Sequence, residues 1–197
     1  VKLKNTGDIS VYKPFVDEEL RNWLNPLVKA AGVEFVVKGQ ENIPQDEAVI
    51  YVPNHQGIFD MPALILNTPT PCGFIAKKEL RKVPIVRTWM WLLDCVFIDR
   101  ENKREARVAI KEAIELINKG RSMVIFPEGT RSKTGEIQRF KGGAFALAKE
   151  AGVEILPVVM DGTTKIFKPK SIWFNWRNVL TVKVLPPISA EKVAATD

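Results

Sequence analysis

The sequence has few of the residues that hold metal ions or disulfide frameworks. It contains two cysteines, Cys72 and Cys95, and a single histidine, His55, in 197 residues. Neither cysteine lies in a CxxC pair or a cluster with the histidine, so we expect no zinc site and no disulfide framework. A chain of this length can bury a sufficient core without them, and its cysteine content suits a reducing compartment.

Long apolar runs are also missing. No stretch reaches the roughly 18–20 uninterrupted apolar residues of a membrane-spanning helix, and no signal sequence opens the chain. The sequence starts at Val1 rather than at a methionine, which leaves open an N-terminal piece that carries an anchor. The chain has no GxSxG motif, which argues against a hydrolase with a serine nucleophile.

Positive charge exceeds negative charge. The formal net charge of +6 favours anionic partners, whether phosphorylated metabolites, anionic lipid headgroups or nucleic acid. With 46% hydrophobic and 26% charged residues, the composition is that of a folded globular protein. Charge alone does not choose between the anionic partners.

Short runs rich in β-branched residues alternate with helical patterns along the chain. This alternation predicts a single α/β domain around a mainly parallel, mixed sheet of about seven strands. The predicted strands are VEFVV from Val33, VIYV from Val49, GFIA from Gly73, CVFI from Cys95, MVIF from Met123, EILPVV from Glu154 and LTVKV from Leu180.

Apolar residues at helical spacing predict the helices. The clearest helix covers residues 103–119, another covers 143–151, and Asp60 is the expected cap of a third. Residues 1–32 are expected to form an N-terminal amphipathic helical segment, which Pro26 kinks or divides, ahead of an α/β domain over 33–197. Packing of this helix on the domain and contact with a membrane surface both stay open.

The only histidine lies in NHQGIFD, directly after the second predicted strand, with four residues between it and Asp60. A neutral imidazole can take a proton from an alcohol when another group holds its second ring nitrogen as N–H, and Asp60 can be that group. The spacing needs a turn that folds Asp60 back toward His55, which Gly57 permits. An isolated pair of this kind is more often incidental, with Asp60 only capping a helix.

Basic side chains follow three other predicted strands. Lys77 and Lys78 follow GFIA, Arg100 ends FIDR, and Arg131 and Lys141 lie in PEGTRS and FKGG after MVIF. Because the carboxyl ends of parallel strands meet at one edge of a sheet, these groups should form a cationic pocket beside the histidine. Such a pocket suits a phosphorylated alcohol, since Arg can grip a phosphate with two parallel hydrogen bonds.

Together these motifs resemble the glycerolipid acyltransferase family. Four blocks occur in the family's order, namely NHQGIFD, VFIDR, FPEGTRS and EILPVV, and the resemblance covers roughly Gly39 to Val159. Two departures concern the loops around the substrate. Family members often carry a serine where Gly57 stands and a glycine where Asp94 stands.

The resemblance implies a reaction in which His55, held by Asp60, deprotonates an acceptor hydroxyl that attacks a thioester directly, without an acyl-enzyme, cofactor or metal. The implied donor is acyl-CoA or acyl-carrier protein, and the implied acceptor is the sn-2 hydroxyl of 1-acylglycerol 3-phosphate (lysophosphatidic acid), giving phosphatidic acid. Backbone amides near Gly129 are expected to stabilise the oxyanion. The expected substrate- and phosphate-binding residues are Lys77, Arg100, Glu128, Gly129, Thr130, Arg131 and Lys141, of which Lys77 rests on charge alone.

Other acceptors remain open, namely glycerol 3-phosphate, another lysophospholipid or an acylated saccharide lipid. A different class of function is a non-enzymatic module that binds anionic lipid or nucleic acid. Such a module has no use for a histidine and aspartate beside PEGTR, so nucleic acid is not an expected partner.

Substrates with acyl chains partition into bilayers, so contact with a membrane surface is expected. Residues 80–93 and 166–177 combine tryptophans with lysine and arginine, which suits the headgroup region. Residues 80–93 could equally form a buried helix or line an acyl tunnel. The expected location is the cytoplasmic face of the cell membrane, as a peripheral or monotopic protein.

Overall fold

The computed structural model describes residues 9–69, 71–132, 134–166 and 178–195. Its helices are α1 (Ile9–Ala30), η2 (Gln40–Asn42), α2 (Asp60–Asn67), η3 (Lys78–Lys82), α3 (Pro84–Leu92), α4 (Lys103–Asn118), α5 (Gly143–Ala151), α6 (Thr163–Ile166) and α7 (Ala190–Ala194). Its strands are β1 (Val33–Lys38), β2 (Ile50–Pro53), β3 (Gly73–Lys77), β4 (Val96–Ile98), β5 (Met123–Val124), β6 (Ile155–Asp161) and β7 (Asn178–Val184).

The strands form one mixed sheet in the order β1-β7-β6-β2-β5-β3-β4. All neighbours are parallel except β6 and β7, so β1 and β7 run opposite to the other five strands. The predicted α/β domain with a mainly parallel sheet of about seven strands is therefore confirmed. The five parallel strands place their carboxyl ends along a single edge.

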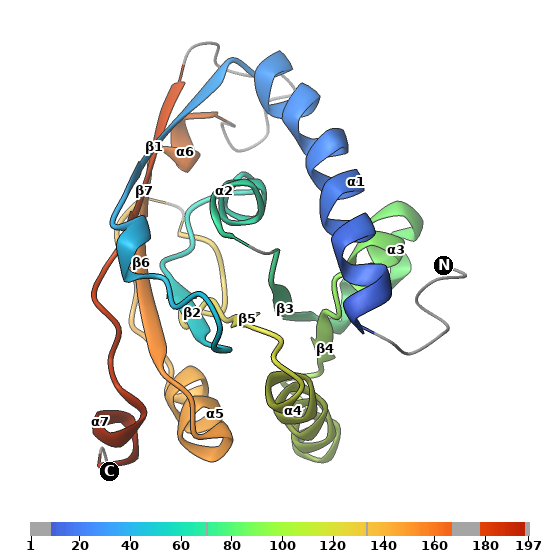
Figure 1. Cartoon of the computed structure of the whole chain (residues 1–197), viewed down its shortest axis with the longest axis vertical. Coiled ribbons are helices and arrows are strands. Elements are labelled where there is room, and N and C mark those ends of the chain that lie inside the picture. Colours follow the sequence, from blue (N-terminus) through green and yellow to red (C-terminus); the bar gives the residue numbers. More distant parts are fainter. Residues whose placement is uncertain (1–8, 70, 133, 167–177, 196–197) are drawn as a thin grey trace.

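Helices cover both faces of the sheet (Figure 1). Helices α1, α2 and α3 lie on one face, where Leu20, Leu64 and Met90 belong to a single apolar core with the sheet. Helices α4 and α5 lie on the other face, where Ala113 and Leu147 pack in a second core. Strand β2 is buried along its whole length and contributes Tyr51 to the first core and Ile50 to the second.

Helix α4 forms where its sequence pattern predicts. The Asn102 side chain caps it by accepting hydrogen bonds from the amides of Arg104 and Glu105, and Gly120 follows its end with φ 82°. Ala109, Ala113 and Ile117 are buried at four-residue spacing. Helix α5 has the predicted bounds and is followed by Gly152 with φ 67°.

Two local expectations are wrong, and a third is wrong in part. Phe59, not Asp60, is the N-cap of α2, and the Asp60 side chain points back into the preceding loop instead of capping the helix. MVIF yields only the two-residue strand β5. The third concerns Pro26, which was expected to kink or divide α1: the helix continues through this proline, which lies on the exposed side while Leu20, Leu24 and Val28 hold the helix on the core, so the division is not found.

One buried ionic contact ties α1 to the core. The Arg121 side chain is 1% exposed, and its Nε donates to Asp94 Oδ2 at 2.9 Å. The Tyr12 hydroxyl donates to the same carboxylate, and burial together with this hydrogen bond raises the pKa of Tyr12 to about 12. Asp94 has φ 58°, the left-handed region that suits the glycine of the family pattern. Asp94 therefore adopts a backbone conformation that is unfavourable for a residue other than glycine, while its side chain makes a contact that joins α1, α3 and β5.

We expect Arg121→Met to lower the free energy of unfolding by about 3–5 kcal/mol, because it leaves the Asp94 carboxylate buried without its cation. The double variant Asp94→Gly with Arg121→Met removes both charges and the unfavourable φ, so its loss should be clearly smaller. Urea denaturation of the variants measures both losses. A double variant that loses as much as the single variant would show that charge pairing is not what holds this contact.

Candidate active site

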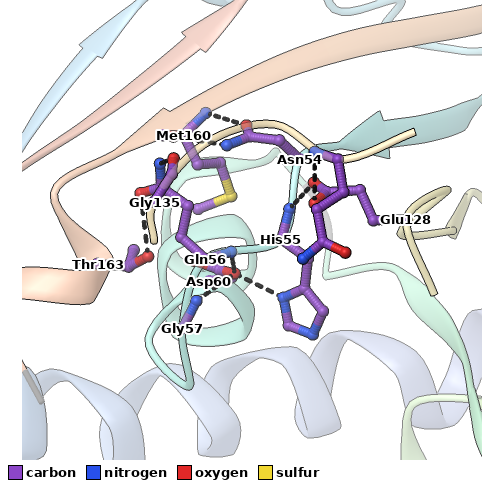
Figure 2. A network of polar contacts seen from close by, with 10 residues as sticks. Asn54, His55, Gln56, Gly57, Asp60, Glu128, Gly135, Met160 and Thr163 are labelled. Carbon is purple, nitrogen blue, oxygen red and sulfur yellow. Dashed lines mark hydrogen bonds and ion pairs between the residues drawn. The ribbon is translucent and has the colours of Figure 1, made fainter. Parts of the chain in front are cut away.

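His55 and Asp60 form a close pair at the carboxyl edge of the sheet (Figure 2). His55 Nδ1 lies 2.7 Å from Asp60 Oδ2, and Asp60 is fully buried while the His55 side chain is 20% exposed. Just after β2, the Asn54 side-chain amide exchanges two hydrogen bonds with the backbone of Met160 in β6. This exchange fixes the point from which the histidine loop leaves the sheet.

The same Asp60 oxygen accepts two further hydrogen bonds, from the amides of Gln56 (2.8 Å) and Gly57 (2.9 Å). The loop is thus wrapped around the carboxylate. Because an ionised carboxylate oxygen can only accept hydrogen bonds, His55 Nδ1 must be the donor in this contact, so the neutral ring carries its proton on Nδ1. Nε2 then carries the lone pair. The expected turn exists, but it does not require a positive φ at Gly57. The glycine instead leaves room for the neighbouring backbone, because a Cβ there would lie 3.1 Å from the carbonyl oxygen of Thr163.

The FPEGTRS loop after β5 holds the His55 backbone on both sides. Glu128 is 3% exposed, and its Oε1 accepts the His55 N–H at 2.7 Å. The Ser132 N–H donates to the His55 carbonyl at 2.8 Å. The Phe126 ring stacks on the imidazole with centroids 4.0 Å apart. The histidine is therefore fixed by its backbone, its ring nitrogen and its ring face.

The histidine opens onto a pocket of about 350 Å³. Six of the nine predicted site residues line it, and they come from the ends of β2, β3, β4 and β5: His55, Lys77, Arg100, Gly129, Thr130 and Arg131. Apolar side chains form the rest of its wall, including Ile58, Met61, Phe74, Leu80 and Phe126. The pocket thus combines cations with an apolar lining beside one histidine.

The cations gather around Gly129, which has φ 74°. Arg100 Nη1 donates to the Gly129 carbonyl, and a Cβ at this glycine would lie 2.6 Å from Arg100 Nη1 and 3.1 Å from Lys141 Nζ. Lys141 lines a smaller neighbouring pocket that shares Arg100 and Gly129. Lys78 instead pairs with Asp99, a contact that raises the pKa of Lys78 and lowers that of Asp99.

Asp60 and Glu128 lie outside the pocket. Asp60 is behind the histidine, and both Glu128 oxygens accept backbone amides, from His55 and from Gln138 (3.1 Å). Of the backbone amides near Gly129, the Gly129 amide itself donates to the Phe126 carbonyl at 3.1 Å, so it is already engaged. Within residues 9–69, 71–132, 134–166 and 178–195, no group of three or more His, Cys, Asp and Glu side chains could hold a metal ion.

Sequence reasoning did not find the roles of Asn54, Phe126 and Ser132. Their signal is position, since each lies within the two motifs, one or two residues from a residue already singled out for chemistry. The apolar residues Ile58 and Met61 follow His55 at three-residue spacing across the turn into α2. All three residues line the pocket.

We expect the neutral His55 ring to exist as the Nδ1–H tautomer, because Asp60 accepts from Nδ1. Since the chain has one histidine, ¹⁵N NMR of histidine-labelled protein above neutral pH reports this ring alone. Asp60→Ala should shift the ring toward the Nε2–H tautomer that free imidazole side chains prefer. A ring that is already predominantly Nε2–H in the wild-type protein would contradict the assigned geometry.

These features define an α/β protein with a histidine–aspartate pair beside a cation-lined pocket at the carboxyl edge of its sheet. Residues 34–161 match the family model described as "Acyltransferase", and the chain belongs to this family. The resemblance seen in the four sequence blocks is thereby confirmed.

Named relatives agree with this assignment. The chain is 35% identical over 164 residues to 1-acyl-sn-glycerol-3-phosphate acyltransferase of Borreliella burgdorferi, covering 83% of this chain and 65% of that protein. It is 37% identical over 165 residues to the Saccharomyces cerevisiae protein of the same name, covering 82% and 54%. The chain thus spans between half and two thirds of the length of these curated relatives.

A solved structure shares the fold. The crystal structure of the 1-acyl-sn-glycerophosphate (LPA) acyltransferase from Thermotoga maritima superimposes with a TM-score of 0.79 at 34% identity, covering 91% of this chain and 71% of that one. At this identity the likeness extends beyond the fold to the family.

Proposed function

We propose that the protein transfers a fatty acyl group from a thioester to the sn-2 hydroxyl of 1-acylglycerol 3-phosphate, giving phosphatidic acid. The observation that carries this proposal is the 2.7 Å contact between His55 and a buried Asp60 at the mouth of a pocket with three cationic side chains. The names of the relatives support the acceptor.

In the proposed mechanism, His55 Nε2 takes the proton of the acceptor hydroxyl as its oxygen attacks the thioester carbonyl carbon. Asp60 stabilises the imidazolium that forms, through the hydrogen bond to Nδ1. The tetrahedral intermediate then collapses, the carbon–sulfur bond breaks, and the departing sulfur takes the proton from the imidazolium. Atoms and charges balance without an acyl-enzyme, a cofactor or a metal.

The cations and the apolar wall suit the two ends of such substrates. Arg131, Arg100 and Lys77 are placed to neutralise the acceptor phosphate, while Met61 and Phe74 offer apolar surface to an acyl chain. Because the Gly129 amide is occupied, the amides of Thr130 and Arg131 are the nearest candidates for the oxyanion. Acyl-CoA and acyl-carrier protein present the same thioester, so either donor fits this chemistry.

We expect release of free thiol from long-chain acyl-CoA or acyl-carrier protein to depend on added 1-acylglycerol 3-phosphate. His55→Ala should reduce this release by about 10²–10⁴-fold, because it removes the general base. A colorimetric thiol assay with both donors measures the rates, and glycerol 3-phosphate as acceptor tests the nearest alternative substrate. Thiol release without any acceptor would indicate a thioesterase instead, and silence with every lysolipid would favour the non-enzymatic lipid-binding module.

We further propose that the protein works at a membrane surface, which α1 and α3 contact. Trp23 and Leu27 of α1 and Ile85 and Trp91 of α3 are between 40% and 68% exposed. The Trp23 ring stacks on Trp89 at 5.8 Å, which joins the exposed faces of the two helices. The exposed cations of this surface are Arg81, Lys82 and Arg87.

This surface connects to the pocket through Leu80, which lines the pocket from η3 just before α3. In this proposal, a lipid substrate enters the pocket from the bilayer on the side of Leu80. Of the second candidate segment, 166–177, only Ile166 lies within the described residues, and it is buried. Among the described residues, no helix is long and apolar enough to cross a membrane.

We expect Ile85→Glu with Trp91→Glu to weaken binding to anionic phospholipid vesicles by at least about tenfold, since each change removes apolar burial and adds repulsion. Sedimentation with vesicles measures binding, and activity on detergent-dispersed substrate should fall much less. Val108→Glu is the matched control for the single variant Ile85→Glu, because the two side chains are 63% and 68% exposed but Val108 lies on α4, on the opposite face of the sheet. Equal effects of both charge insertions would contradict the proposed surface.

A further inference from the structure

We infer that Glu128, the acidic residue of FPEGTRS, is a positioning residue for His55 and not a ligand of the acceptor. This inference rests on the proposed function, in which His55 is the base. It differs from the sequence-based expectation that Glu128 binds the substrate together with Gly129, Thr130 and Arg131. The loop instead has two sides, one facing the base and one facing the pocket.

Glu128 does not line the pocket, and each of its carboxylate oxygens accepts a backbone amide. Oε1 accepts from the His55 amide (Figure 2). Oε2 accepts from the Gln138 amide, and only 3% of the residue is exposed. None of the ion pairs found among the described residues includes it. An anionic side chain would also repel a phosphate, so a role in holding the acceptor is electrostatically unfavourable.

The contact replaces the sheet hydrogen bonds that His55 lacks. His55 lies beyond the end of β2, so its N–H and C=O have no neighbouring strand. The Glu128 carboxylate accepts the His55 N–H at 2.7 Å, and the Ser132 N–H donates to the His55 carbonyl at 2.8 Å. With the backbone fixed on both sides, the direction of the imidazole is set before any substrate binds.

The second oxygen links the base to another part of the site. Gln138 lies in the segment that leads to Lys141, whose ammonium group is near Gly129. Gln56 Nε2 also donates to the Gly135 carbonyl at 3.0 Å, so the histidine loop and this segment meet twice. One buried carboxylate thereby holds the base and a cation-bearing segment in register.

A carboxylate suits this position better than an amide. Both amides that reach Glu128 are donors, and a glutamine offers only one acceptor while its NH₂ faces the other N–H. Glu128→Gln should therefore lose one of the two contacts while keeping the side-chain shape. A displacement of the base by about 1 Å costs on the order of 10²-fold in rate.

The structural half of the test uses the single histidine. Selective ¹⁵N-histidine labelling gives one backbone amide signal, that of His55. In the wild-type protein this amide should resonate downfield and exchange slowly with solvent, as a short hydrogen bond to a buried carboxylate requires. Glu128→Gln should move the signal upfield and speed its exchange. An exposed-amide signal in the wild type would overturn the inference without any variant.

The kinetic half separates positioning from binding. Glu128→Gln should lower kcat for acceptor-dependent thiol release by about 10–100-fold and leave the acceptor KM within about twofold. Arg131→Gln is the matched contrast, since it faces the pocket: it should raise the acceptor KM and leave the His55 amide signal in place. Thermal unfolding shows that both variants are folded.

Two results from the variants would also overturn the inference. One is an unchanged His55 amide signal in Glu128→Gln, and the other is a raised acceptor KM with unchanged kcat, as expected for Arg131→Gln. Failure of the proposed function would give a different result: the wild-type protein would show no acceptor-dependent thiol release, or His55→Ala would retain that release. In that case the role of Glu128 in catalysis falls as well, even where the amide signal moves.

Discussion

The rest of the site depends on one oxygen of Asp60. A carboxylate that is fully removed from water is strongly destabilised unless hydrogen bonds replace its hydration, and Asp60 Oδ2 receives three of them within 2.9 Å. Two of the three donors are backbone amides of the loop that starts with His55. Among the described residues, Asp60 Oδ1 is buried without a hydrogen-bond partner, so Oδ2 alone carries the contacts that stabilise the charge. A loop that relaxed would remove two of its three donors, and this cost fixes the turn that presents the base.

The parallel sheet supplies the rest of the arrangement. Because β2, β5, β3 and β4 run in one direction, loops that are far apart in sequence meet at one edge. The histidine loop follows β2, the FPEGTRS loop follows β5, Lys77 ends β3, and Arg100 lies just after β4. The motifs are many residues apart because, between consecutive parallel strands, helices bring the chain back to the edge where the next strand begins.

Sequence reasoning reached the strands, the two main helices and the pairing of His55 with Asp60, since these follow from periodicity and from motif order. It could not reach the direction of a side chain inside a loop. Glu128 and Arg131 belong to the same block, yet one faces the base and the other the pocket, and only the backbone path after β5 decides between them. It also missed the Asp94 contact, because Tyr12 and Arg121 are distant in sequence and meet Asp94 only through the fold.

The site separates charge across the histidine. Two buried carboxylates, Asp60 and Glu128, lie on the protein side of His55, while Arg100, Arg131 and Lys77 line the pocket in front of it. During the proposed transfer, the imidazole becomes positive and the reacting carbonyl becomes negative. The positive charge then forms beside the carboxylates and the negative charge forms beside the cations, so the fixed charges favour both halves of the same step. The two carboxylates do not have to reorient during this step, because backbone amides already hold Asp60 and Glu128 before the substrates arrive.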